Sequence, residues 1–277
     1  MDNNFKLKTS GMIKYLQCQS KEFNQLTKHA FSTRCGGISS KSYSSLNLSF
    51  NVNDKIENVI ENRKIFFNAL DINYKSIVSA KQVHKDNIAV VNKGDKARGA
   101  LNYRKSISES DALITDIPNL PLLMCYADCV PVLILDPDKK AIGLAHAGRN
   151  GTLLNISLKT LLKMKETFGT RPDSCLAVIF PSIGPCSYYF TNREIIADWL
   201  TQENITNEVV HIQGKNNWQI DLKKANNIQL IKGGIKSKNI FTSTECTADN
   251  PDIYFSHHRD KGETGRMAAI FMLKDNR

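Results

Sequence analysis

The sequence has no long hydrophobic run. A helix that crosses a bilayer needs about 20 consecutive apolar residues, and no segment of the 277 residues approaches that length. The first residues, Met1 to Lys6, also lack the basic and then apolar pattern of a secretory signal peptide. We therefore expect a cytoplasmic protein with no membrane partner.

Long basic runs are absent too, although the formal net charge is +10. Nucleic-acid binding favours clustered Lys and Arg with aromatic side chains between them, whereas the lysines here are spread along the chain. We expect no nucleic-acid partner and interpret most of the charge as a solvated lysine surface. A small phosphate pocket is still compatible with it.

Repeats, low-complexity tracts and proline-rich linkers are missing as well. A chain of this length can bury one large core, so we predict a single domain over residues 1–277. Residues 1–28 are expected to form a polar N-terminal lead-in with one edge strand at most. Residues 93–108 are polar and basic, and are expected to form a surface insertion.

The seven cysteines are scattered and odd in number. In a reducing compartment this usage favours free thiols, metal ligands or catalytic thiols over a disulfide framework.

Hydrophobic periodicity predicts a mixture of strands and helices. A helix is expected over about 56–70 with Asp54 as its N-cap, and another from 151 or 152 to Phe168 with Gly169 as its stop. Further predicted elements are strands at 29–34, 76–82, 87–92, 111–115, 130–135, 141–145, 176–180, 239–243 and 267–273, and helices at about 193–203 and 221–232.

Cys129 and His146 lie at the ends of two predicted strands. Cys129 precedes the apolar run 130–135, residues 136–140 turn the chain, and His146 ends the next strand. The two side chains therefore meet at one end of a strand pair. With His84, which lies between two strand-like segments, they match the His₂Cys donor set of a catalytic zinc site with one open position.

The residues alone leave other interpretations open. Cys129 is equally suited to be a small buried hydrophobe, and both histidines to be hydrogen-bonded loop residues. As nucleophile and base, Cys129 and His146 would make a cysteine hydrolase. Asp128 would either orient a metal ligand or stabilise a turn.

Longer blocks carry a resemblance to a known family. The sequence resembles the YfiH/YlmD family in Gln82–His84, Ala127–Leu133 and Ala145–Gly148. Further matching blocks lie at 33–39, 45–48, 111–115, 183–186, 221–222, 246–247, 255–256, 259–260 and 264–266. They follow the family order and cover nearly the whole chain.

The resemblance implies an α+β fold, with mixed β-sheets packed together and flanked by helices, and a purine nucleoside enzyme. The implied activities are phosphorolysis of adenosine, inosine, guanosine and methylthioadenosine, and deamination of adenosine, with purine nucleosides and phosphate as partners. It also implies that His84, Cys129 and His146 hold zinc at the catalytic centre. An older label of the family, polyphenol oxidase or laccase, would imply copper.

A multicopper phenol oxidase is disfavoured by the sequence. Six histidines are too few to fill blue-copper and trinuclear sites together, and no His-x-His pair is present. A non-catalytic nucleoside-binding protein is a further alternative.

The chain departs from the family pattern in two places. Arg149 and Asn150 stand where tryptophan and arginine usually follow the AHAG block, and His257-His258 replace a tyrosine-arginine pair. No metal ligand is lost, so the departures concern substrate preference.

Phosphorolysis needs a cationic cradle for phosphate. The candidate substrate or phosphate ligands are Arg34, Asn47, Arg63, Arg259 and Arg266, with Arg149 as a variant member. Deamination would use a water whose pKa zinc lowers to around 7. Its proton shuttle would be Asp86 or Asp128, because the H-x-E glutamate of known zinc deaminases is absent after His84.

Overall fold

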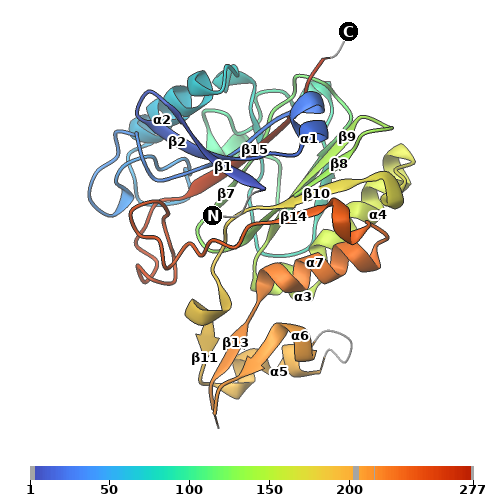
Figure 1. Ribbon diagram of the computed structural model, residues 1–277. Coiled ribbons are helices and arrows are strands. Elements are labelled where there is room, and N and C mark those ends of the chain that lie inside the picture. The colour runs from blue at the N-terminus through green and yellow to red at the C-terminus, as the bar shows by residue number, and fades with distance from the viewer. Residues whose placement is uncertain (1–3, 202–205, 215, 276–277) are drawn as a thin grey trace.

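The computed structural model describes residues 4–201, 206–214 and 216–275. Two six-stranded mixed sheets pack together and carry helices on their outer faces (Figure 1). The first sheet has the order β1 (Phe5–Ser10), β2 (Ile13–Cys18), β3 (Thr27–Ser32), β15 (Met267–Leu273), β7 (Leu122–Tyr126) and β4 (Val78–Ser79). The second has the order β14 (Ile240–Thr242), β10 (Leu176–Ile179), β8 (Val130–Asp136), β9 (Ala141–Ala147), β6 (Ala112–Thr115) and β5 (Ile88–Val90).

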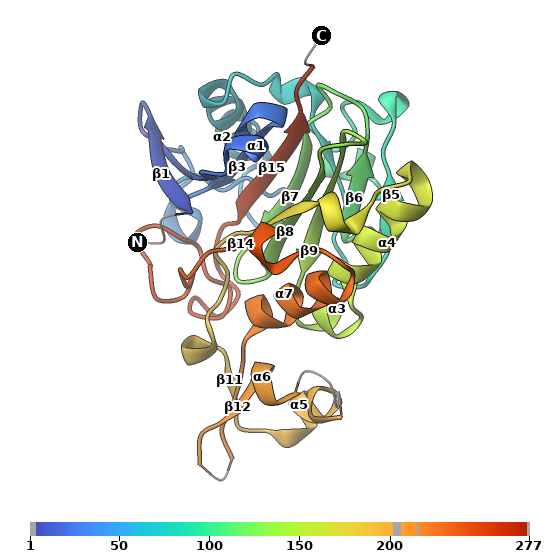
Figure 2. The same cartoon turned by 45° about the vertical axis from the view of Figure 1, so that its right-hand side comes forward.

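A third, three-stranded sheet projects below the two large ones (Figures 1 and 2). It has the order β11 (Tyr189–Phe190), β13 (Trp218–Ile220) and β12 (Val210–Ile212). The helices are α1 (Lys21–Leu26), α2 (Ile56–Ala69), α3 (Arg149–Leu153), α4 (Ile156–Phe168), α5 (Arg193–Leu200), α6 (Thr206–Val209) and α7 (Leu222–Lys232). Trp199 and Trp218 join the apolar core beneath the second large sheet, so the small sheet shares that core.

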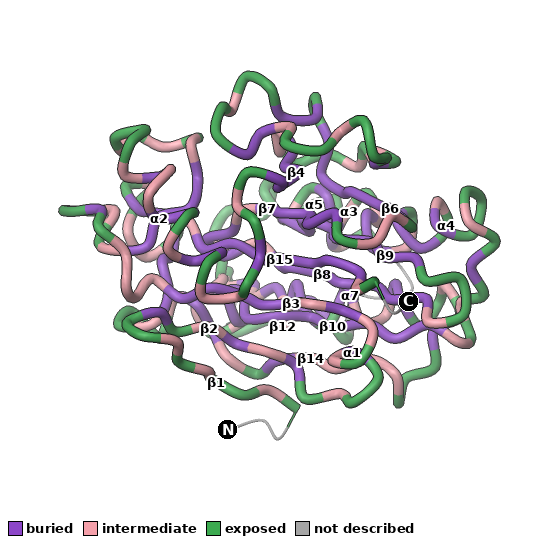
Figure 3. Tube along the Cα trace, turned by 90° about the horizontal axis from the view of Figure 1, so that it is seen from above, coloured by how far each residue is buried: buried purple, intermediate pink, exposed green. Residues whose placement is uncertain are grey.

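Successive side chains of a strand point to opposite faces of its sheet, which explains why apolar layers form on both faces. In β15 all seven residues are buried, with Ala269 and Phe271 in the core between the sheets and Ile270 against Phe66 and Phe67 of α2. The outer face of the second sheet is covered by α4 and α7 in the same way. Viewed from above, the central strands form a buried band with exposed loops around it (Figure 3). The predicted α+β architecture of packed mixed sheets is confirmed.

Hairpin β8–β9 brings Cys129, just before the start of β8, close to His146, near the end of β9. Both strands are buried along all seven residues, and Val130 pairs with Ala147 and Pro131 with His146. The antiparallel register therefore brings Cys129, just before β8, next to the end of β9. This is the meeting of strand ends that the sequence predicted.

The prediction for residues 1–28 was wrong. Residues 1–3 lie outside the described residues, and residues 4–28 are no polar lead-in: they contain β1, β2 and α1, and β2 pairs with β3 inside the first sheet. Ile13, Leu16 and Phe23 are buried. The lysines of β1 and the exposed Lys14 of β2 give this segment its polar composition, although these apolar side chains of β2 and α1 are buried.

Residues 93–108 are also more integrated than a surface insertion. Ala100, Ser106 and Ile107 are buried, and Tyr103 lines the main cavity. The basic residues that suggested an insertion lie on the outer side of a segment whose inner side packs against the first sheet.

Two helix starts differ from the predictions. Asp54 does not cap α2, since the N-cap is Lys55 and the Asp54 carboxylate instead accepts from Ser39 and Asn47. The helix expected from 151 is divided into α3 and α4 by Asn155, which has a φ of 61°. Its predicted end is confirmed, because Gly169 adopts a φ of 69° after Phe168. Of the helices in the described ranges, none is both long enough and apolar enough to span a membrane.

Candidate metal centre and its cavity

His84, Cys129 and His146 come together in space. Their potential ligand atoms all lie within 4.8 Å of one another. Tetrahedral ligation at zinc bond lengths places donor atoms roughly 3.5 Å apart, so the group needs only small side-chain adjustments to hold such an ion. Within the described part of the chain, no other group of three or more His, Cys, Asp or Glu side chains is gathered in this way.

Three different elements supply these side chains. Cys129 directly precedes β8, and His146 is the second-last residue of β9. His84 lies in the loop between β4 and β5, where its φ of 59° is in the left-handed region. A non-glycine residue there needs support from its surroundings.

That support comes from Asp111, a fully buried carboxylate directly before β6. Its oxygens accept hydrogen bonds from the backbone N–H groups of Val83 (3.1 Å), His84 (3.0 Å) and Lys85 (2.9 Å). Asp111 Oδ1 also lies 2.9 Å from Nδ1 of His146. One carboxylate thus shapes the His84 loop and orients His146 so that its Nε2 faces the other two ligands.

The sequence reasoning placed Asp111 at the start of a strand and in a block that matches the family, but assigned it no role. An aspartate opening an otherwise apolar strand was the available signal. Its partners could not be deduced, since three of them are backbone groups more than twenty residues away.

The charge of Cys129 supports ligation, whereas His146 must release a proton when a metal ion binds its Nε2. Burial alone would raise the pKa of the Cys129 thiol, but His146 and His84 lower it to about 6. Burial opposes protonation of His146, yet Cys129 and Asp111 together raise its pKa. Cys129 is therefore a thiolate near neutral pH, the form that binds a metal ion.

Gly148 keeps the space around the ligands open. A Cβ atom at this position would lie 3.0 Å from Cys129 Sγ and 3.1 Å from His84 Cδ2. The glycine of the AHAG block is therefore needed because the backbone approaches two of the three ligands closely.

The metal group faces a cavity of about 510 Å³. Arg63, Arg149 and Arg266 line it together with Tyr188 and Phe190. Arg63 is almost fully buried and donates to the carbonyl oxygens of residues 48, 99 and 100. Arg266 donates to the carbonyl oxygens of residues 264 and 265. Within the described residues, no carboxylate forms an ion pair with either guanidinium.

The other candidate substrate ligands lie outside the cavity lining. Arg34 donates to the carbonyl oxygens of Ser44 and Pro251 and lies over the ring of Phe255. Asn47 is fully buried and donates to Asp54. Their positions give no support to direct contact with substrate.

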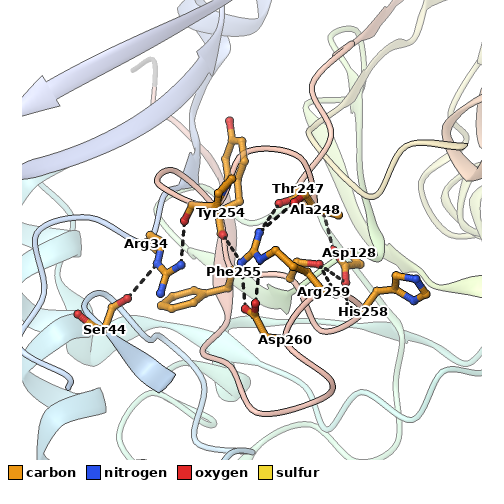
Figure 4. A network of polar contacts seen from close by, with 12 residues as sticks. Arg34, Ser44, Asp128, Thr247, Ala248, Tyr254, Phe255, His258, Arg259 and Asp260 are labelled. Carbon is orange, nitrogen blue, oxygen red and sulfur yellow. Dashed lines mark hydrogen bonds and ion pairs between the residues drawn. The ribbon is translucent and has the colours of Figure 1, made fainter. Parts of the chain in front are cut away.

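Arg259 is outside the lining as well. It binds Asp260 through two hydrogen bonds and donates to the carbonyl oxygens of residues 247, 248 and 254 (Figure 4). Like Arg34, it holds the 246–260 segment in place.

Asp128 stabilises the C-terminal loop. It accepts from the hydroxyls of Thr247 and Ser256 and from the backbone N–H of His258, while its own φ is 88° (Figure 4). Of the two interpretations left open for Asp128, this contact set favours the stabilised turn. Asp86 forms an ion pair with Lys159 and does not line the cavity.

Comparison with known proteins places the chain among relatives of the same shape. It is 33% identical over 258 residues to the purine nucleoside phosphorylase YlmD of Bacillus subtilis strain 168, which covers 93% of this chain and 92% of that protein. A family model described as "Multi-copper polyphenol oxidoreductase laccase" matches residues 28–274. The chain belongs to this family, the YfiH/YlmD family.

Solved structures agree with the YfiH/YlmD assignment. The crystal structure of hypothetical protein YfiH from Bacillus licheniformis aligns with a TM-score of 0.91 at 34% identity, over 98% of this chain and all of that one. YlmD from Geobacillus stearothermophilus aligns with a TM-score of 0.89 at 29% identity, over 97% and 99% of the two chains. Both the predicted resemblance and the predicted fold are confirmed.

Proposed function

We propose that the chain is a zinc-dependent purine nucleoside phosphorylase. It converts adenosine, inosine, guanosine or methylthioadenosine to the free base and ribose 1-phosphate or methylthioribose 1-phosphate. One observation carries the proposal: a single cavity contains both the His₂Cys group and two arginines that form no ion pair with any carboxylate of the described residues. Its Bacillus subtilis relative YlmD is named a purine nucleoside phosphorylase, which supports the proposal.

Arg63 and Arg266 form the proposed phosphate subsite. A buried guanidinium without a counter-charge is costly, and an anionic ligand offsets that cost. Both arginines lie close enough to Cys125, another cavity residue, to influence its pKa, which burial keeps raised. A phosphate bound there would lie beside the metal group, because Arg266 is also an electrostatic neighbour of Cys129.

Each residue of the metal group has a defined task. His84, Cys129 and His146 hold the ion, Asp111 fixes two of these ligands, and Gly148 leaves them room. A zinc ion held by these residues would supply a Lewis acid able to polarise an oxygen or nitrogen of the bound nucleoside. The two arginines orient the phosphate for attack on the sugar and exclude water from that position.

Adenosine deamination is the second proposed activity of the same centre. It requires a proton carrier near the attacking water. Asp128 is the one carboxylate of the described cavity lining, and its oxygens already accept three hydrogen bonds. We therefore propose deamination as slower than phosphorolysis.

A cysteine hydrolase is favoured by one specific observation. Cys129, His146 and Asp111 have the order of a nucleophile, a base and an orienting carboxylate. Metal content separates the two functions, because a thiolate that ligates zinc is not a free nucleophile. Activity that survives chelation would favour the hydrolase.

A multicopper oxidase finds no such support, despite the description of the family model. All six histidines lie in the described ranges, and only two of them join Cys129 in a ligand group. Stoichiometric copper with oxygen uptake on phenols would overturn this judgement.

The decisive experiment compares wild type with Cys129→Ala. We expect about one zinc per wild-type chain, little zinc in the variant, and phosphate-dependent release of hypoxanthine from inosine only by wild type. Cys186→Ala is the matched control, since this thiol is exposed and outside the cavity. Equal zinc in Cys129→Ala and wild type would contradict the metal assignment.

A further inference from the structure

One side of the cavity is an aromatic wall that carries a cation. Tyr188 and Phe190 meet edge to face with ring centroids 4.8 Å apart. The Arg149 guanidinium carbon lies 5.5 Å from the centre of the Phe190 ring. The Tyr188 hydroxyl is close enough to Arg149 for the cation to lower its pKa, against the larger raising effect of burial. All three side chains line the cavity.

The wall and the arginine pair line the same cavity as the metal group. Arg149 opens α3 directly after Gly148, where an added Cβ would lie 3.0 Å from Cys129 Sγ. Tyr188 has Arg149, Cys129 and Asp128 as its electrostatic neighbours. Arg63 instead has Cys125, and Arg266 has both cysteines. Arg149 therefore lies beside the metal group, in the same cavity as Arg266 and Arg63.

The Arg149 guanidinium has N–H groups that are available to a ligand. Within the described residues it forms no ion pair with a carboxylate, although a guanidinium offers five N–H groups and no acceptor. Its contact with Phe190 leaves the edge of the guanidinium plane available for hydrogen bonds. A ligand that reaches it beside two aromatic rings must be flat and must present acceptors.

We infer that Arg149, held on this wall by Phe190 and Tyr188, recognises the O6 and N7 atoms of a purine and gives this enzyme a preference for 6-oxopurines over adenine. The inference rests on the proposed nucleoside function and deepens it.

Hydrogen-bond chemistry gives the preference its direction. Hypoxanthine and guanine present two acceptors, O6 and N7, on the edge that arginine binds in a bidentate manner. Adenine presents an amino donor at position 6, which an arginine donor cannot satisfy. A glutamine offers one donor and one acceptor, the combination that suits adenine N6 and N7. Arg149→Gln is therefore expected to move the preference toward adenine.

The test measures equilibrium binding of hypoxanthine and adenine to the zinc-loaded protein by calorimetry, without phosphate. Wild type should bind hypoxanthine roughly ten-fold tighter than adenine, and Arg149→Gln should lose or reverse this ratio. Phe190→Leu, which removes the ring beneath the guanidinium, should reduce the ratio less. Arg171→Gln is the matched control, because Arg171 is exposed and pairs with Asp173.

Two results would overturn the inference. One is an affinity ratio that stays the same in wild type and Arg149→Gln. The other is a loss of phosphate affinity in Arg149→Gln with an unchanged base preference, which would assign Arg149 to the phosphate subsite. Because binding is measured without turnover, this test is independent of phosphorolysis. Failure of the proposed function would appear separately, as intact nucleosides after incubation of the zinc-loaded protein with phosphate.

Discussion

Asp111 shows how one buried carboxylate can organise a site without being a metal ligand itself. Its pKa is held below the usual range, since the hydrogen bonds from His146 and from the 83–85 backbone outweigh the effect of burial. The left-handed backbone of His84 and the orientation of His146 both depend on this charge.

Asp111→Asn tests that dependence. An amide has one acceptor oxygen in place of two, and its NH₂ group faces donors that were previously bound. We expect zinc affinity to fall by about 10- to 100-fold, the usual effect of removing a partner of a ligating histidine. Competition with a chromogenic chelator measures the change.

The control is Asp86→Asn, which removes a carboxylate two residues from His84. Asp86 pairs with Lys159 at the surface, so its removal should leave zinc affinity unchanged. Equal losses in the two variants would mean that net charge near the loop, and not the Asp111 contacts, determines affinity.

At this scale the sequence predicts which side chains gather at the site better than which groups hold them there. His84, Cys129 and His146 could be selected by residue type, strand ends and resemblance. The Asp111 contacts could not, because backbone N–H groups carry no sequence signal. For the same reason Arg34 and Arg259 could not be distinguished from Arg63 by residue type alone.

Among the elements, α1 and β2 are the ones whose contribution to the core was least predicted from the sequence. Phe23 of α1 is fully buried, stacks on Phe271 of β15 at 5.5 Å, and meets His29 at 5.0 Å. The N-terminal segment therefore closes the end of the core between the sheets.

Phe23→Ala should destabilise the protein by about 3–5 kcal/mol, the usual cost of deleting a buried phenylalanine. Urea unfolding measures this difference. Met12→Ala is the control, because Met12 is 80% exposed and its removal should change stability by no more than about 0.5 kcal/mol. An unchanged free energy of unfolding in Phe23→Ala would instead support the prediction that this segment is a lead-in outside the core.

Elements with strong local signals were predicted well. The last strand has the predicted bounds because seven consecutive apolar residues are buried on both faces. The helix end at Phe168 follows from Gly169, which supplies the left-handed stop. In contrast, β4 and β5 are much shorter than predicted. The chain between them is diverted into the His84 loop by Asp111, a tertiary effect.

At the scale of the whole molecule, packing two sheets together buries a histidine in an apolar layer. His29 of β3 lies between the rings of Phe23 and Phe180. Burial, with smaller effects from Lys274 and Lys8, lowers its pKa to about 3. The pattern of apolar strands predicted the layers, but not which polar residue would lie between them, since that depends on which faces meet.

This burial makes stability depend on pH. The ordinary pKa of histidine is 6.5, so below that pH the unfolded chain binds a proton that folded His29 does not. The free energy of unfolding should therefore fall as pH decreases from 6.5, by up to about 1.4 kcal/mol per pH unit, until His29 itself titrates near pH 3. Urea unfolding of chelator-treated protein between pH 7 and 4 measures this slope.

His29→Gln isolates the contribution, because glutamine does not titrate and every other group is common to both proteins. The difference between the two unfolding free energies should shrink or reverse as the pH decreases, since only wild type loses stability through position 29. Carboxylates such as Asp111 also lose their favourable contacts in acid, but they do so in both proteins and cancel in the difference. Parallel pH profiles would show that His29 is protonated in the folded state and that water reaches the layer between the sheets.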